Sequence, residues 1–143
     1  MTMPADMRAY NRQVIEEFRA NAGVLGGQFA GGNMLLLTTT GRTTGEPHTA
    51  PMMFKEPGDR RLLVIASNNG ATAHSSWYRN LVAHPDVIVE RGPERFEATA
   101  RTAEGAEREA LWADLVASHP FFVEHQQQAG TRQIPLVVLE RPA

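Results

Sequence analysis

The chain has 143 residues, of which 42% are hydrophobic and 21% charged, a net charge of −2 and no cysteine. This length predicts one domain spanning 1–143, and the composition is typical of a soluble globular protein. The absence of cysteine excludes disulfides, thiolate nucleophiles, iron–sulfur clusters and cysteine-based zinc sites, so any redox chemistry needs a bound cofactor. The slight negative charge gives no global field for nucleic acid, and we expect no nucleic-acid partner.

The N-terminal ten residues lack the apolar run of a signal peptide, and no apolar run approaches the ~20 residues that cross a bilayer. We therefore expect a cytoplasmic protein. Its basic residues are uneven, because thirteen are arginines and Lys55 is the only lysine. The arginines suit phosphate or carboxylate ligands, although genome composition explains such a bias equally well.

The first predicted element is an amphipathic helix that begins after Asp6 and ends at Gly23. Its apolar stripe, at steps of three and four, consists of Met7, Tyr10, Val14 and Phe18. We expect this stripe to pack on the body of the protein, and docking on a membrane surface is the alternative. A glycine-rich linker at 23–32 follows.

Three strands come next, at 33–40, 49–55 and 61–67, with a loop at 41–47 and a turn at 56–59. Their short links favour an antiparallel meander. A short helix or helical crossover at 73–83 ends before Pro85.

A second hairpin is predicted at 87–90 and 94–102, because Phe96, Ala98 and Ala100 alternate with polar residues. A helix at 104–117 should bury Ala106, Ala110, Leu111, Leu115 and Val116. An irregular or helical piece at 121–127 and a strand at 134–139 complete the chain. About six mainly antiparallel strands with three helices predict an α+β fold, whose sheet can close into a small barrel with flanking helices.

The loop Thr38-Thr39-Thr40-Gly41-Arg42-Thr43-Thr44-Gly45 is the first candidate binding feature. Its glycines allow backbone N–H groups to form a concave nest, while Arg42 supplies a charged fork for phosphate or carboxylate. It lacks the ending of a Walker motif. A plain polar hairpin loop is the alternative.

The second feature consists of Ala66 to Ala71 after a strand and Ser75 to Asn80 at a helix start. Small residues let a planar ring lie against the backbone, and helix N-terminal N–H groups favour an anion. A turn and a cap are the simpler interpretation, and Trp77 and Tyr78 either cover a cofactor or fill the core. The five histidines lack metal-site spacing, so no metal is expected, and no serine-protease-like triad is indicated.

Several motifs in the same order resemble those of the deazaflavin-dependent nitroreductase family. They are residues 35–47 (Leu-Leu-Leu-Thr-Thr-Thr-Gly-Arg-Thr-Thr-Gly-Glu-Pro), Pro51, 66–71, Trp77-Tyr78-Arg79-Asn80-Leu81, His84-Pro85 and 131–138. The resemblance runs from about Val14 to the C-terminus. It implies a flavin-reductase-like split β-barrel that binds coenzyme F-420, an 8-hydroxy-5-deazaflavin, in a groove. It leaves open a homodimer and a peripheral membrane contact through the N-terminal helix.

The same resemblance implies roles for individual residues. The coenzyme's phosphate, tail and ring edge would be held by Arg42, Thr43, Thr44, His48, Thr49, Ala50, Pro51, Met52 and Met53. The ring would lie along Ile65, Ala66, Ser67 and Asn68, and the far side would be closed by Ser76, Trp77, Tyr78, Arg79 and Asn80. Ser67 is the candidate catalytic residue, through a hydrogen bond to negative charge developing on the substrate. The candidate acceptor pocket consists of Met52, Met53, Phe121, Phe122 and His125.

Three departures from the family pattern concern charge. Thr43 and Asn68 stand where lysine is common, and His48 stands where arginine is common. Each charge-assisted hydrogen bond contributes roughly 1.5–3 kcal/mol, so we expect weaker coenzyme binding that depends on Arg42. The phenols that the family uses near 121–125 are absent, so the substrate range of relatives is not transferred.

The expected activity is hydride transfer from reduced coenzyme F-420 to a small organic acceptor such as a quinone, a nitro-aromatic or an enone, in which the cofactor supplies the chemistry. Two alternatives remain open. One is a coenzyme carrier without catalysis, and the other is a split barrel that binds FMN or haem.

Overall fold

The computed structural model describes residues 7–24, 33–58 and 60–142, and all of their side chains except those of Met7, Arg8 and Asn69. The predicted cap Asp6, most of the glycine-rich linker and Asp59 lie outside these residues. The elements in chain order are α1 (Met7–Ala20), β1 (Met34–Thr40), β2 (Pro47–Met53), β3 (Lys55–Gly58), β4 (Arg61–Ile65), the 3-10 helix η2 (Asn68–Gly70), α2 (Ser76–Ala83), β5 (Asp86–Arg91), β6 (Glu94–Thr102), α3 (Gly105–Ser118), α4 (Phe121–Ala129) and β7 (Leu136–Glu140).

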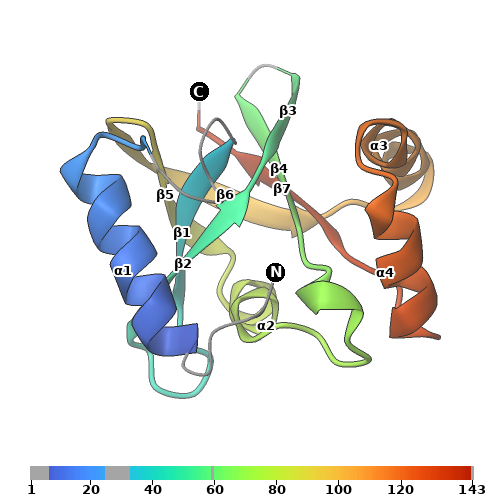
Figure 1. Ribbon diagram of the computed structural model, residues 1–143, viewed down its shortest axis with the longest axis horizontal. Helices are drawn as coiled ribbons and strands as arrows, with labels where there is room; N and C mark the ends of the chain where they lie inside the picture. Colours follow the sequence, from blue (N-terminus) through green and yellow to red (C-terminus); the bar gives the residue numbers. More distant parts are fainter. Residues whose placement is uncertain (1–6, 25–32, 59, 143) are drawn as a thin grey trace.

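The strands form one antiparallel sheet in the order β2-β1-β5-β6-β7-β4-β3. Its two edge strands, β2 and β3, are joined in the chain by the single residue Phe54. Because one residue spans only ~3.5 Å, the edges must lie next to each other, and the sheet therefore curls into a barrel. β2 also contacts β4, across the line where the sheet is split (Figure 1).

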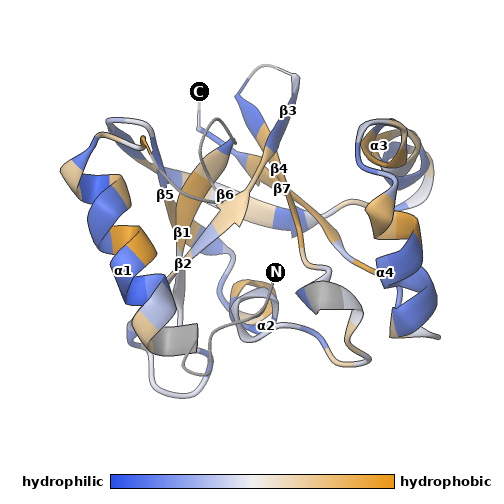
Figure 2. Ribbon diagram, viewed as in Figure 1, coloured by the Kyte–Doolittle hydropathy of each residue, from blue (hydrophilic) through white to orange (hydrophobic). Residues whose placement is uncertain are grey.

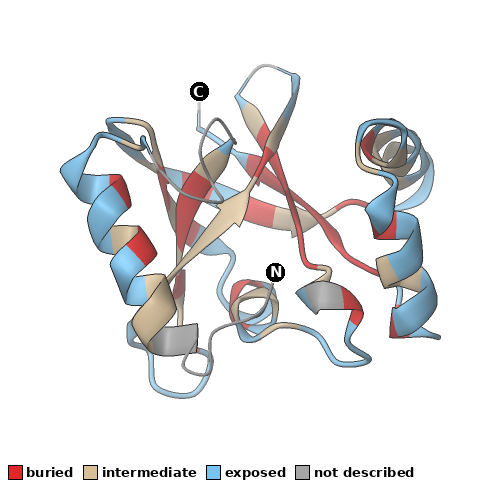
Figure 3. Cartoon of the chain, viewed as in Figure 1, coloured by how far each residue is buried: buried red, intermediate tan, exposed pale blue. Residues whose placement is uncertain are grey.

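Alternating side chains divide the core into an inside and an outside. Along β4, Leu62 and Val64 point into the barrel, whereas Leu63 and Ile65 point outward to a cluster covered by α3 and α4. Both faces of these strands are buried, which explains their almost continuous apolar sequence (Figure 3). The inner cluster also includes Leu81 of α2, which thus packs at one end of the barrel.

Helix α1 covers the outer face of β1. Val14 and Phe18 pack on Leu36, and Phe18 is only 1% exposed. Figure 2 shows the hydrophobic side of α1 turned toward the strands. Arg19 adds two hydrogen bonds to the buried carboxylate of Glu90 on β5, at 2.9 and 2.8 Å. The predicted packing of the apolar stripe is confirmed, and the part of it that is described is not available to a membrane.

The α+β class is confirmed, but the predicted count of about six strands and three helices is too low, since the described residues form seven strands and four α-helices. The segment 56–58 was expected to be a turn and is instead most of β3, paired with β4. An edge strand tolerates Pro57, because its missing N–H is not needed by a neighbour. Phe54 separates β2 from β3, whereas the prediction had one strand through residue 55.

Smaller differences concern the helices. The segment 121–127 is fully helical as part of α4, and α2 begins at Ser76 rather than near residue 73. Ala106 and Ala110 are exposed, because α3 contacts the core mainly through Leu115. No helix within the described ranges is long and apolar enough to cross a membrane.

Substituting Phe18 with alanine tests how far α1 stabilises the fold. Removing this fully buried ring should lower the free energy of unfolding by about 3–5 kcal/mol, measured by urea denaturation. The matched control Gln13→Ala, on the exposed side of α1, should change it by less than about 0.5 kcal/mol. Equal effects of the two changes would show that α1 is not part of the cooperative core.

Candidate functional site

The loop between β1 and β2 is compact. The N–H of Gly41 donates to the carbonyl of Glu46 (2.8 Å), and that of Gly45 donates to the carbonyl of Gly41 (2.9 Å). A Cβ at Gly41 would lie 2.7 Å from Oγ1 of Thr44 and 2.9 Å from Nε2 of His48, so a side chain there would displace both of these side chains. The loop therefore brings the predicted residues Thr44 and His48 together beside Gly41.

Arg42 extends from this loop to the start of α2. Its Nη1 donates to Oδ1 of Asn80 (2.8 Å), Oγ of Ser76 (3.2 Å) and the carbonyl oxygen of Ser76 (3.3 Å). Its Nε and Nη2 make no hydrogen bond to another described residue. The guanidinium is thus oriented by one nitrogen and keeps donors for a ligand, since arginine has five N–H groups.

Asn80 connects three elements. It is 3% exposed, its Oδ1 also accepts from the backbone N–H of Arg42 (3.2 Å), and its Nδ2 donates to Oγ1 of Thr39 on β1 (3.3 Å). The resemblance assigned Asn80 to the coenzyme, and the structure places it beneath Arg42, where it positions that side chain.

The predicted ring contacts lie on β2 and at the end of β4. Thr49 shares a hydrogen bond with Thr38 (2.7 Å). Met52 packs on the inner cluster, while Met53 and Ile65 pack on the outer one. Because β2 contacts β4, these two rows of predicted residues lie side by side.

The chain leaves β4 through a tight loop into η2. Asn68 adopts a left-handed φ of 50°, and its Nδ2 donates to the carbonyl of Ala73 (2.9 Å). Gly70 also has a positive φ, and a Cβ there would lie 2.6 Å from Oε1 of Gln128 and 3.1 Å from the carbonyl oxygen of His125. This close approach brings the loop after β4 against α4, which carries the predicted acceptor residues.

Arg132 binds the backbone of the loop that follows β4. Its guanidinium donates to the carbonyls of Ala66 (3.1 Å), Ser67 (2.6 Å) and Ala71 (2.9 Å), and lies 3.1 Å from Nδ1 of His74. The residue is 7% exposed and pairs with no carboxylate in the part of the chain that the structure describes. A buried positive charge therefore lies directly under the candidate Ser67.

A side chain of α4 stabilises the backbone around Arg132. Gln126 donates from Nε2 to the carbonyl of Arg132 (2.8 Å) and accepts at Oε1 from the N–H of Ile134 (2.9 Å). The sequence contains Arg132 within one of the family motifs, but nothing in its spacing indicates that a buried arginine would organise a loop more than sixty residues earlier.

The arginines also affect His74. Partial burial lowers the pKa of its imidazole, and the charges of Arg132 and Arg79 lower it further. The ring lies against Tyr78 at 4.9 Å between centroids. His74 is thus held in its neutral form, with Nδ1 accepting from Arg132.

The predicted acceptor residues form an aromatic group on α4. Phe121 contacts Phe122 (4.3 Å between centroids) and His125 (5.4 Å), and His119 adjoins both phenylalanines. Phe122 is buried in the outer cluster with Ile65, whereas Phe121 is 43% exposed. Nδ1 of His125 is buried with no hydrogen-bond partner among the described residues.

Other predicted residues lie in their expected segments with different surroundings. Trp77 and Tyr78 pack on the inner cluster, and Tyr78 shares a hydrogen bond with Thr102 (2.9 Å), so their rings contribute to the core. Thr43 and Arg79 are exposed, and Ala50 and Pro51 are half-buried on β2. No cluster of three or more histidine or acidic side chains suited to a metal occurs within the described residues.

Residues 10–141 match the protein-family model described as F420H(2)-dependent quinone reductase. The chain belongs to this family. The resemblance to deazaflavin-dependent reductases is confirmed, with quinone as the acceptor in the family's description.

Individual relatives and solved structures are similar to most of this chain. The F420H(2)-dependent quinone reductase Rv1261c of Mycobacterium tuberculosis is 34% identical over 127 residues, which are 87% of this chain and 85% of that protein. A solved F420-H2 dependent reductase, FDR-A, is 37% identical, with a TM-score of 0.65 over 75% of this chain and 93% of that one. A structure described as a domain-swapped dimer is 33% identical, with a TM-score of 0.68 over 96% of this chain and all of that one. The expected split barrel and oxidoreductase class are confirmed.

Replacing Arg132 with glutamine tests its role under the loop. The change leaves buried carbonyls without donors and should lower the free energy of unfolding by about 2–4 kcal/mol in urea denaturation. Removing the charge should also raise the pKa of His74, followed by NMR titration of the imidazole.

The control Arg79→Gln changes an exposed arginine and should leave the free energy of unfolding within about 0.5 kcal/mol. Arg132→Lys keeps the charge and should keep the pKa of His74 low. An unchanged His74 pKa in folded Arg132→Gln would contradict the electrostatic role of Arg132.

Proposed function

We propose that this protein transfers a hydride from reduced coenzyme F-420 to a quinone, and that the coenzyme lies between the 41–45 loop, β2, the end of β4 and α2. The proposal rests on the guanidinium of Arg42, which Ser76 and Asn80 orient at the start of α2. The sequence of the chain matches the family over residues 10–141. Arginine is suited to the phosphate and carboxylates of such a coenzyme.

The residues present fit an anionic tail. Arg42 and Arg79 are exposed near the start of α2, and the hydroxyl of Thr43 is exposed on the neighbouring loop. The N-terminal N–H groups of α2 add partial positive charge at the same place. No carboxylate is within ion-pair distance of Arg42 among the described residues, so its charge is available to a ligand.

The residues also fit a planar ring. Ala50, Pro51 and Met52 on β2 are half-buried and offer small or apolar surface at the split, beside the buried Ile65 and Ala66 at the end of β4. When bound, the reduced coenzyme supplies a hydride, and water or a protein group supplies the proton that completes reduction of a quinone to its hydroquinone.

The protein's own contribution is orientation and charge. Ser67 Oγ makes no hydrogen bond to a described residue, so it is free to donate to a quinone oxygen on which negative charge develops. The buried guanidinium of Arg132, bound to the carbonyl of Ser67, favours negative charge in the same region. The aromatic group of Phe121, Phe122 and His125, which adjoins the loop after β4, would hold the acceptor.

A coenzyme carrier without catalysis is the second candidate. Thr43, His48 and Asn68 favour it, because the family resemblance implies lysine or arginine at these three positions. It predicts coenzyme binding without oxidation of the reduced coenzyme by any of a panel of quinones. Steady turnover with one of them would exclude it.

We further propose that the protein can form a homodimer, as one similar structure is described as a domain-swapped dimer. Light scattering coupled to size-exclusion chromatography distinguishes a monomer of 15.8 kDa from a particle of twice that mass. A membrane contact through α1 is not proposed, since Val14 and Phe18 of its apolar stripe are buried and Tyr10 is half-buried against β1.

Changing the charge around Arg42 tests where the coenzyme's anionic groups bind. Arg42→Gln should raise the dissociation constant, measured by fluorescence titration, by about tenfold or more, because it removes charge-assisted hydrogen bonds of about 1.5–3 kcal/mol. Thr43→Lys adds a cation beside it and should lower the constant by a similar factor.

The control Arg95→Gln removes an exposed arginine on β6 and should leave coenzyme affinity unchanged. If neither Arg42→Gln nor Thr43→Lys alters the dissociation constant, the tail does not bind at this loop.

Ser67→Ala tests the hydroxyl beside the acceptor. We expect kcat for quinone reduction to fall by about 100-fold, the usual effect of removing one donor to a developing oxyanion, while the coenzyme's dissociation constant stays the same. Thr72→Ala, an exposed hydroxyl five residues further on, is the control and should keep full activity. An unchanged kcat in Ser67→Ala would assign the donor role to another group.

A further inference from the structure

A cavity of about 470 Å³ lies at the end of the barrel where β4 begins and β7 ends. It is lined by Glu56, Arg60, Arg61, Leu62, Arg91, Phe96, Leu139, Arg141 and Pro142. None of these residues belongs to the set assigned to the coenzyme or acceptor. The cavity lies at the start of β4, whereas the proposed coenzyme site lies at its other end, so the two are separate.

The floor of the cavity is apolar. Leu62 and Leu139 are 5% and 1% exposed and belong to the inner cluster of the barrel, and Phe96 packs against that cluster. Helix α2 contributes Leu81 to the same cluster and lies below the sheet in Figure 1, whereas β3, which carries Glu56 of the cavity, lies at the top. The cavity is therefore the open end of the barrel core, and its volume is in the range of small-molecule sites.

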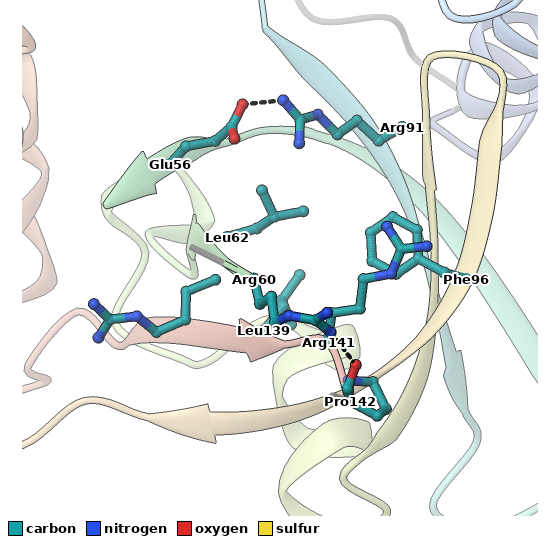
Figure 4. Close-up of a pocket in the computed structure, with 9 residues that line it drawn as sticks. Glu56, Arg60, Leu62, Arg91, Phe96, Leu139, Arg141 and Pro142 are labelled. Carbon is teal, nitrogen blue, oxygen red and sulfur yellow. Dashed lines mark hydrogen bonds and ion pairs between the residues drawn. The ribbon is translucent and has the colours of Figure 1, made fainter. Parts of the chain in front are cut away.

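The lining of the cavity contains more arginines than carboxylates. Four arginines and a single glutamate line it, although the whole chain has a net charge of −2. Figure 4 shows the Glu56–Arg91 pair on one side of the opening and Arg60 with Arg141 on the other, with Leu62 between them. This local excess of cations over an apolar floor favours a ligand that is both anionic and hydrophobic.

The arginines differ in how far they are neutralised. Arg91 pairs with Glu56, Arg61 with Glu107 (3.7 Å) and Arg141 with Glu94 (3.2 Å), and the Arg141 guanidinium lies 4.3 Å above the Phe96 ring. Arg60 donates to the carbonyl of Pro142 (2.6 Å) and has no carboxylate partner among the described residues.

The backbone sets Arg60 beside Arg141. The N–H of Arg141 donates to the carbonyl of Arg60 (2.8 Å), so the two residues are held together across the strands. Arg60 also adopts a left-handed φ of 59°, a conformation that usually favours glycine or asparagine. A long cationic side chain thus occupies a backbone position that disfavours it, at the mouth of a cavity.

We propose that this cavity binds a small organic anion with an apolar body, such as an aryl-alkyl carboxylate. The carboxylate would bind the guanidinium of Arg60, which has no carboxylate partner among the described residues, next to Arg141, and the apolar body would cover Leu62, Phe96 and Leu139. This binding does not depend on the proposed coenzyme or on turnover.

NMR titration of the isotope-labelled full-length protein with 4-phenylbutyrate tests the proposal. We expect amide shifts at residues 60–62, 96 and 139–141. Arg60→Asn removes the charge while suiting the left-handed backbone, and should weaken binding by about tenfold, as should Arg141→Gln. Arg95→Asn, an exposed arginine on β6 outside the cavity, is the matched control and should bind as the unchanged protein does.

Two further probes separate the parts of the ligand. The neutral analogue 4-phenylbutan-1-ol and inorganic phosphate alone should each bind at least tenfold more weakly than 4-phenylbutyrate. Equal binding of either one would overturn the proposal, because then the charge or the apolar body contributes nothing. Shifts confined to residues 42–53 and 65–80, or an equal loss of affinity in Arg95→Asn, would also overturn it.

Discussion

The single residue Phe54 imposes the closure on which the rest of the structure depends. Strands β2 and β3 are the opposite edges of the seven-stranded sheet, yet only Phe54 separates them in the chain. Its ring is buried in the inner cluster at 6% exposure, so the link is stabilised by the core that it helps to enclose.

This closure creates both ends of the barrel and the line of the proposed site. Because the sheet curls, β2 reaches β4, and residues from two successive hairpins share one line of contact. At one end α2 and the loop with Arg42 complete the proposed coenzyme site. At the other end the core opens to the cavity that four arginines line. One topological constraint thus produces two proposed binding surfaces of different chemistry.

Much of the fold could be predicted because its patterns are local. Alternation along Phe96, Ala98 and Ala100 and the stripe through Val14 and Phe18 reflect which side of one element is buried. Pro57 and Gly58 favour a turn, so the segment 56–58 was expected to be one, although it pairs with β4 as an edge strand. The candidate site was predictable from ordered motifs around Arg42 and Ser67, and the supporting contacts of Asn80 were not, since they join segments about forty residues apart.

The sequence by itself determined the α+β class, the need for a borrowed redox cofactor in a chain without cysteine, and the loop that carries Arg42. Only the tertiary structure decided that Trp77 and Tyr78 fill the core, that Arg132 lies under Ser67, and that four arginines meet at the barrel's open end. The physical reason is that side-chain spacing encodes the buried side of a helix or strand, whereas charge interactions depend on distances set by sheet closure.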